Sequence, residues 1–156
     1  MSREVSQEAQ LESFLDKFTP AVAAEAREIL AAMQRKFPGA MRLVYDNYNA
    51  LAIGFGTGEK VADAIFSIAV FPRWVSLFFL NGVQLHDPEK LLKGSGNQVR
   101  HIVLDGPGTL RQPGVKALMA QALDLAAKPM PKTGGKLVIK SIAAKQRPRR
   151  PAERTK

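Results

Sequence analysis

The chain has 156 residues, enough for one domain whose core buries roughly 70% of the surface exposed by its unfolded form. It contains no cysteine, which excludes disulfides, thiol nucleophiles and zinc sites built on thiolates. The net charge is +9, and the whole excess lies in residues 128–156, which hold 10 Lys/Arg and one acid, Glu153, whereas residues 1–127 hold 13 of each sign. The sequence therefore predicts a charge-balanced domain over residues 1–127 and a basic, proline-containing tail over residues 128–156.

Signals for export and membrane insertion are not found in the sequence pattern. The first ten residues, MSREVSQEAQ, are charged, and no apolar run approaches the roughly 18 residues that a transmembrane helix needs. We therefore expect a cytoplasmic protein that does not bind a membrane.

Two helices are predicted at the start of the chain. The first begins at about Ser6, which can cap it, and continues through Phe18, because apolar residues recur at intervals of three and four on one face. The second has Thr19 as its N-cap and Pro20 as its first helical residue, and it ends at Phe37-Pro38-Gly39.

From Met41 the hydrophobic period changes to two. Segments 41–46, 50–56, 64–71 and 73–80 are rich in branched and aromatic residues and predict an antiparallel meander. The fourth segment is apolar on both faces, so we expect it to be central and covered on both sides, or to present one face to a partner. For Trp74 and Phe78, ordinary core packing is the favoured interpretation, and a pocket wall or a dimer surface is the alternative.

The second half of the chain predicts a short helical piece at Pro88–Leu92, a fifth strand at 99–105 and a third helix at 113–127. Residues 137–142 could form one last short strand. The residues beyond them have too little apolar content to fold alone and are expected to be mobile. The fold class is therefore α+β: an antiparallel sheet of about five strands with the N-terminal helices and the late helix packed on it.

Four stretches of the sequence, taken in this order, resemble the YdhG-like family of bacterial domains of unknown function. They are FLDKFTPAVAAEAREIL, PGAMRLVYDNYNALAIGF, WVSLFFLNGVQLHDPEKLLKGSG and VRHIVL followed by the last helix, and they cover about residues 11–127. The resemblance implies a frataxin-type fold. It also implies that one branch of the family serves as an intracellular iron chaperone that uses exposed helix acids.

A stripe of acids on the first helix is a candidate metal site. Glu4, Glu8, Glu12 and Asp16 are four residues apart, and like charges at this spacing destabilise a helix by about 0.2–0.5 kcal/mol per pair, which a bound cation would relieve. Oxygen ligands of this kind suit iron, magnesium or calcium, and the family resemblance favours iron and adds Glu25 and Glu28. The favoured alternative is an ordinary solvated helix face.

The glycine-rich stretch around Gly94-Ser95-Gly96 is read as a turn. It lacks the spacing of phosphate-binding loops and of a serine nucleophile, and the alternative is a weak anion site at Lys93 and Arg100. The two histidines, His86 and His101, lack the spacing of a metal site.

The basic tail offers a third class of function. Its cations, Lys145, Arg147, Arg149, Arg150 and Arg154, could bind nucleic acid weakly and without sequence preference. No aromatic residue stands among them to stack on bases, so a solubilising tail is favoured.

No activated nucleophile or positioned acid and base is recognisable, so we expect the protein not to be an enzyme. The leading hypothesis is a non-enzymatic YdhG-like binding module without a cofactor, whose partner is an unknown protein or small ligand and which could form a homo-oligomer. The alternatives are a frataxin-like iron-binding chaperone and weak nucleic-acid association through the tail.

Overall fold

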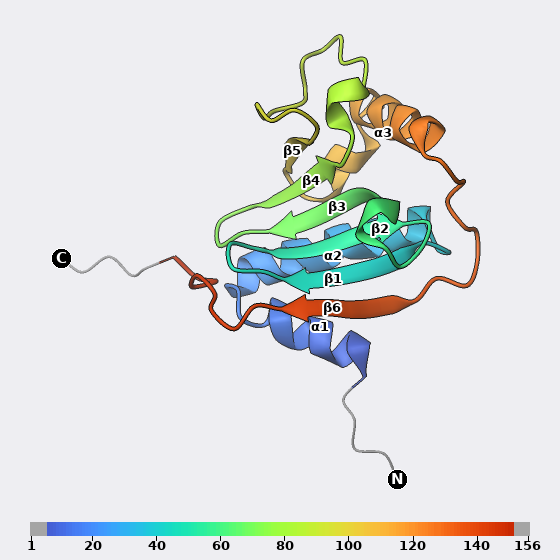
Figure 1. The fold of residues 1–156 in the computed structure, drawn as a ribbon. Coiled ribbons are helices and arrows are strands. Elements are labelled where there is room, and N and C mark those ends of the chain that lie inside the picture. The colour runs from blue at the N-terminus through green and yellow to red at the C-terminus, as the bar shows by residue number, and fades with distance from the viewer. Residues whose placement is uncertain (1–5, 152–156) are drawn as a thin grey trace, which may run out of the picture.

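The computed structural model describes residues 6–151, which form one six-stranded sheet and three α-helices (Figure 1). The strands are β1 (Met41–Asp46), β2 (Leu51–Gly56), β3 (Ala64–Val70), β4 (Val75–Phe79), β5 (Arg100–Leu104) and β6 (Leu137–Ile142). Their order across the sheet is β5-β4-β3-β2-β1-β6, and all neighbours are antiparallel except β1 and β6, which are parallel. The predicted α+β class is confirmed, with six strands instead of about five.

The first two helices begin at the expected caps. Ser6 Oγ accepts a hydrogen bond from the Ala9 amide at the start of α1 (Gln7–Leu15), and Thr19 Oγ1 accepts one from Val22 at the start of α2 (Pro20–Lys36). The third helix, α3, spans Pro113–Leu125. The first and third helices therefore end two or three residues earlier than the sequence predicts. None of the helices in residues 6–151 has the length and apolar character needed to cross a bilayer.

The hydrophobic core lies between the sheet and α2, which runs behind the sheet in Figure 1. Each strand turns one side toward this core, as in one row across five strands in which every residue is at most 7% exposed: Val44, Ile53, Ile68, Leu77 and Ile102. Full burial of such a side chain contributes about 1.5–3 kcal/mol, so this layer supplies most of the stability of the fold.

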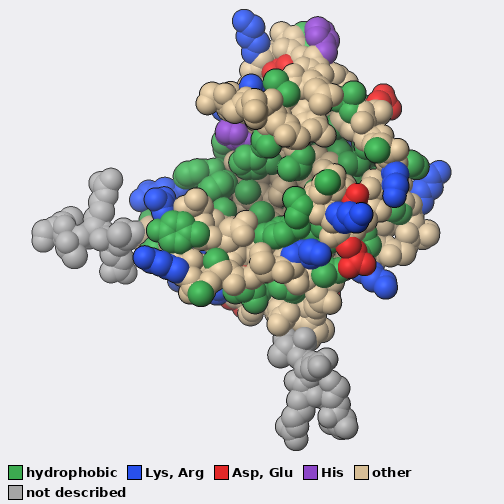
Figure 2. Space-filling model, viewed as in Figure 1, with side chains coloured by type: hydrophobic (Ala, Val, Ile, Leu, Met, Phe, Trp, Pro, Cys, Tyr) green, Lys and Arg blue, Asp and Glu red, His purple; other side chains and the backbone are tan. Residues whose placement is uncertain are grey.

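The opposite side of the sheet, which we call the outer face, has no α-helix in front of its central strands among the described residues (Figure 1). Figure 2 looks onto this side and shows hydrophobic side chains gathered over its centre. Trp74 is 42% exposed and Val103 is 45% exposed, while Phe78 is half-buried. The expectation that Trp74 lies in ordinary core packing is therefore wrong, whereas β4 itself is buried on this side at Ser76 and half-buried at Phe78.

The short helix expected at Pro88–Leu92 does not form. Asp87 accepts hydrogen bonds from the amides of Leu91 and Leu92 at 2.9 Å each, and Lys90 has a positive φ of 56°. The carboxylate takes the amides that a helix would pair with backbone carbonyls, so the segment becomes a side-chain-stabilised turn. Short 3₁₀ helices form elsewhere, at Val61–Asp63, Gly82–Gln84 and Pro107–Arg111.

The link into β1 passes very close to the link into β6 at Gly39. A Cβ atom at Gly39 would clash with the Pro131 carbonyl oxygen and the Thr133 amide, both of which are backbone atoms that cannot turn away. We expect Gly39→Ala to lower the free energy of unfolding by about 1–3 kcal/mol, as overpacking does. Gly96→Ala is the matched control, because a Cβ there meets nothing within 4 Å. Equal urea midpoints for the two variants would contradict the close approach.

Candidate functional site

Two hairpin turns and the chain after β6 meet at one end of the sheet, on the left in Figure 1. The turns are residues 47–50, between β1 and β2, and residues 71–74, between β3 and β4. Residues 143–151, which we call the docked segment, lie against the first hairpin: the Ala143 amide donates to the Asp46 carbonyl at 2.8 Å, and the Arg147 amide donates to the Tyr48 carbonyl at 2.9 Å. The expected mobility of the chain beyond residue 142 is therefore wrong for this segment.

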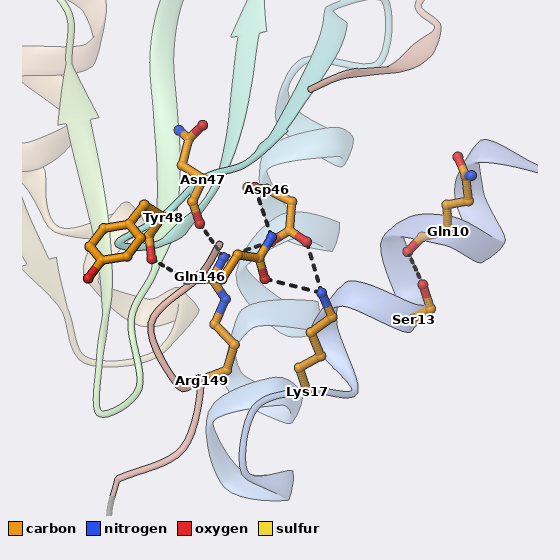
Figure 3. Close-up of polar contacts among 8 residues, drawn as sticks. All are labelled: Gln10, Ser13, Lys17, Asp46, Asn47, Tyr48, Gln146 and Arg149. Carbon is orange, nitrogen blue, oxygen red and sulfur yellow. Dashed lines mark hydrogen bonds and ion pairs between the residues drawn. The ribbon is translucent and has the colours of Figure 1, made fainter. Parts of the chain in front are cut away.

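Arg149 anchors the docked segment through a buried ion pair (Figure 3). Its Nη2 donates to Asp46 Oδ1 at 2.8 Å and also to the carbonyl of Asn47. The side chains of Asp46 and Arg149 are only 1% and 3% exposed, and Lys17 Nζ approaches the second carboxylate oxygen at 3.0 Å. Because either charge alone would be strongly unfavourable out of water, the pair fixes the position of the segment.

The Asp46 carboxylate is held in its charged form. Burial alone raises the pKa of this carboxyl, but Gln146, Arg149 and Lys17 around it together hold the pKa below its ordinary value. Gln146 also joins the parts of the cluster, because its Nε2 donates to the Asp46 carbonyl at 3.0 Å and its Oε1 accepts from Lys17 Nζ at 3.3 Å. Asp46 is almost inaccessible to solvent, so this cluster supports the structure and does not offer a reacting group.

A groove of about 690 Å³ opens beside this anchor, and we call it the hairpin-end groove. Three separate stretches of the chain line it. They are Asn49 from the first turn, Phe71, Pro72, Arg73 and Trp74 from the second turn, and Arg147, Pro148 and Arg150 from the docked segment. In Figure 2, Lys and Arg side chains flank hydrophobic ones at this end of the molecule.

All the charged side chains that line the groove in the described part of the chain are positive. Arg73, Arg147 and Arg150 are exposed, and none of them forms an ion pair within residues 6–151. Arg150 Nε donates to the Lys17 carbonyl at 3.1 Å, and the Arg147 guanidinium lies 5.6 Å from the centre of the Tyr48 ring. These contacts hold the two cations in place without neutralising them, so the groove attracts anions.

The groove also offers a flat aromatic surface. The rings of Phe71 and Trp74 stack with centroids 4.9 Å apart and planes 21° apart. Phe71 is half-buried and its ring packs against the Trp74 ring, whereas Trp74 is 42% exposed. A planar ligand group can therefore stack on the tryptophan.

The structure separates the tail cations that the sequence groups together. Arg147 and Arg150 line the groove, and Lys145 is exposed nearby in the sequence. Arg149 is buried and paired with Asp46, so its assignment as a nucleic-acid contact is wrong. Arg154 lies outside the described residues.

The acids proposed for iron are mostly engaged by other residues. Glu8 pairs with Arg42 at 2.8 Å, and Arg27 pairs with both Glu12 and Asp16, at 2.9 and 2.7 Å. Glu25 accepts the Gly106 amide at 2.8 Å, Glu28 is exposed, and Glu4 lies outside the described residues. Arg27 and Arg42 thus reduce the repulsion between the acids of the first helix, and this repulsion is the reason for expecting a bound cation there. Within residues 6–151, no three potential ligands are gathered to hold a metal, and the iron site stays a prediction.

The glycine-rich stretch forms a turn between two paired residues. Lys93 and His101 form an antiparallel bridge, with amide–carbonyl distances of 2.8 and 2.9 Å, and Gly94 between them has a positive φ of 123°. Arg100 Nη1 donates to the carbonyls of Gly96 and Val99, at 2.6 and 2.8 Å. Because Arg100 is occupied by the turn itself, this geometry favours the turn over an anion site.

Neither histidine lies in the hairpin-end groove. His86 is exposed in a loop, and its amide donates to Gln121 Oε1 at 2.8 Å. His101 is in β5, where its ring stacks on Phe78.

Phe71 and Arg73 are not predicted as site residues, and Trp74 is predicted mainly as core. The sequence FPRW at 71–74 could have indicated them, because a proline and an arginine between two predicted strands are typical of an exposed turn, here next to a tryptophan. The sequence cannot show that this turn lies beside the tail, which is more than seventy positions away.

Comparison of the chain with protein-family models, with curated proteins and with solved structures found no match. The resemblance to the YdhG-like family stays a prediction.

Proposed function

We propose that this protein is a non-enzymatic binding module of the YdhG-like type that holds single-stranded nucleic acid in the hairpin-end groove. The observation that carries the proposal is that three arginines with no acidic partner within residues 6–151 line the same groove as the stacked Phe71–Trp74 pair. Single strands offer the matching chemistry, since their phosphates are anionic and their unpaired bases expose flat faces.

The groove favours a single strand over a duplex. In a duplex the bases are stacked on one another, and an aromatic side chain reaches a base face only after that stacking is broken. Trp74 stands at the surface beside the cations and not on a helix that could enter a major groove. A single strand can place its backbone along the arginines and one base on Trp74 without that cost.

The binding is expected to be weak and tolerant of sequence. Every base has a face that can stack on Trp74, and arginine contacts to phosphate carry no sequence information. Asn49 is the one amide side chain among the described residues that line the groove, so few groups there can read base edges. If three arginines each neutralise one phosphate, the slope of log K against log salt is about −2.

The lining of the groove does not suit catalysis. Among residues 6–151 the lining contains no carboxylate, histidine, serine or cysteine, so this part of the chain brings none of these acids, bases and nucleophiles to the groove. The chemistry that the groove offers is charge attraction and stacking, which supports binding without turnover.

The test uses the only tryptophan of the chain as its own reporter. Titration with an oligothymidylate should quench Trp74 fluorescence to saturation at low salt, and the affinity should fall with salt at a slope of about −2. Absence of saturable quenching, together with absence of binding by anisotropy of a labelled oligomer, would refute the proposed function.

Two substitutions test which residues carry the binding. Trp74→Ala should weaken binding of a labelled oligomer about 5- to 150-fold, which corresponds to the roughly 1–3 kcal/mol of one stacked base. Arg147→Ala should weaken it and reduce the salt slope by about 0.7. Arg35→Ala is the matched control, because Arg35 is also exposed but lies in the last turn of α2, near the start of β1. Equal losses for Arg35→Ala and Arg147→Ala would mean that binding follows net charge and does not use the groove.

A further inference from the structure

A second stacked aromatic pair lies on the outer face, on the strand that begins beside the hairpin-end groove. The rings of Phe78 in β4 and His101 in β5 are 5.0 Å apart between centroids, with planes 24° apart, and both residues are half-buried. We propose that the bound single strand continues from the hairpin-end groove along the outer face of β4 and stacks a second base on this pair. The inference rests on the proposed function and extends it from one base to a path several nucleotides long.

The two aromatic pairs lie on the same side of the sheet. Side chains alternate along a strand, so Trp74, Ser76 and Phe78 share one face, and four residues at about 3.3 Å each separate Trp74 from Phe78 by roughly 13 Å. Ser76 is fully buried between them, and its neighbours across the sheet are Ala69 in β3 and Val103 in β5. These side chains are small or apolar, so no charged side chain stands between the two platforms in this row.

A cation accompanies the second pair, as arginines accompany the first. Lys93 is exposed and is bridged directly opposite His101, so Phe78, His101 and Lys93 form one row across the outer face. Directly opposed antiparallel residues point to the same side, which places the Lys93 ammonium beside the aromatic pair. Each end of the proposed path therefore combines a stacked aromatic pair with at least one cation that forms no ion pair among the described residues, and this combination matches a base and its phosphate.

The imidazole itself is suited to stacking. Burial and the charge of Lys93 both lower the pKa of His101 below its ordinary value, which favours the neutral form of the ring. From the sequence, Lys93 is a candidate for an anion site that also uses Arg100. In the proposed path Lys93 instead contacts a phosphate beside the Phe78–His101 pair, and Arg100 is not needed.

The experiment compares an oligothymidylate of about two nucleotides, which is too short to span the roughly 13 Å from Trp74 to Phe78, with one of about twelve nucleotides, which lies within the range of site sizes of single-strand binding modules. Phe78→Leu removes the ring and keeps a half-buried apolar side chain. It should weaken binding of the long oligomer about five-fold or more and leave the short oligomer unchanged, whereas Trp74→Ala should weaken both. Val103→Ala, a substitution on the same face that removes no ring, is the control and should change neither.

Lys93→Ala provides a second test at an exposed position that should not affect folding. It should reduce the salt slope of the long oligomer by about 0.7 and leave that of the short oligomer unchanged. The inference is overturned if neither Phe78→Leu nor Lys93→Ala distinguishes the two lengths while Trp74→Ala still weakens both. If the unaltered protein binds neither oligomer, the proposed function fails as well.

Discussion

Replacing Asp46 with alanine is expected to lower the free energy of unfolding by about 3–5 kcal/mol, a large part of the stability of a domain of this size. The Arg149 guanidinium is 3% exposed, and its Nη2 lies 2.8 Å from Asp46 Oδ1, so the substitution leaves a buried charge without its counterion. Among the described residues Arg149 pairs with no other carboxylate, and its Nε has no hydrogen-bond partner, so no second acid there offsets the charge. Urea unfolding followed by Trp74 fluorescence measures the effect.

The matched control is the other partner of the same carboxylate. Lys17 Nζ is 3.0 Å from Asp46 Oδ2, but its side chain is 43% exposed and water can replace the carboxylate, so Lys17→Ala should cost less than about 1 kcal/mol. The double variant Asp46→Ala/Arg149→Ala should be less destabilised than the sum of the single variants, because it leaves neither charge alone. Similar losses for Asp46→Ala and Lys17→Ala would show that the pair does not anchor the segment.

The dependence of stability on acid pH provides a second measurement of the Asp46–Arg149 pair. The pKa of Asp46 is lowered in the folded protein from its ordinary value of 3.8, so the unfolded chain binds this proton more tightly than the folded one. The contribution of the charged Asp46 carboxylate to the free energy of unfolding is therefore fully present above pH 3.8. It is lost as the pH falls below that value, through the folded pKa. The Asp46→Ala variant should lack this part of the acid dependence.

Local elements of the fold follow from neighbouring residues and could be predicted. The caps at Ser6 and Thr19 and the proline at Pro20 fix helix starts through contacts within three residues, and the alternating pattern at 41–46 gives the bounds of β1 without error. The segment at Pro88–Leu92 is misjudged because helical composition is overridden by one carboxylate, Asp87, that captures two amides.

The docking of the chain after β6 could not be predicted from its composition. The docked segment is basic and poor in apolar residues, which is typical of mobile tails. Its position depends on a polar pair, Asp46 and Arg149, whose members are 103 residues apart in the sequence. Apolar content does not reveal a buried ion pair, so a prediction based on apolar content places the segment in solvent.

The same limit explains why the candidate site is only half predicted. Arg147 and Arg150 stand out as cations in the sequence, yet no aromatic residue is near them in the chain. The fold supplies the aromatic surface from the β3–β4 turn, where Phe71 and Trp74 stack. The sequence disfavours nucleic-acid binding because no aromatic residue stands among the tail cations, and the structure brings an aromatic pair to them from the β3–β4 turn.

Deletion of residues 143–156 should abolish most single-strand binding and yet destabilise the protein less than Asp46→Ala does. The deletion removes Arg147 and Arg150 and leaves Arg73 as the one arginine of the described groove lining, so the salt slope should fall from about −2 to about −0.7. Stability should suffer less, because removing the segment also uncovers Asp46 and lets water solvate its carboxylate. Titration of a labelled oligomer and urea unfolding of the same preparation measure both effects.

Arg149→Ala separates charge from position in this prediction. It leaves Arg147 and Arg150 in the chain but removes the side chain that holds them at the groove. If an ordered groove is the site, this variant should bind nearly as poorly as the deletion, because the two cations no longer stand beside Trp74. If it binds as well as the unaltered protein, the arginines act as unplaced charges, and neither the groove nor the buried pair is needed to hold a strand.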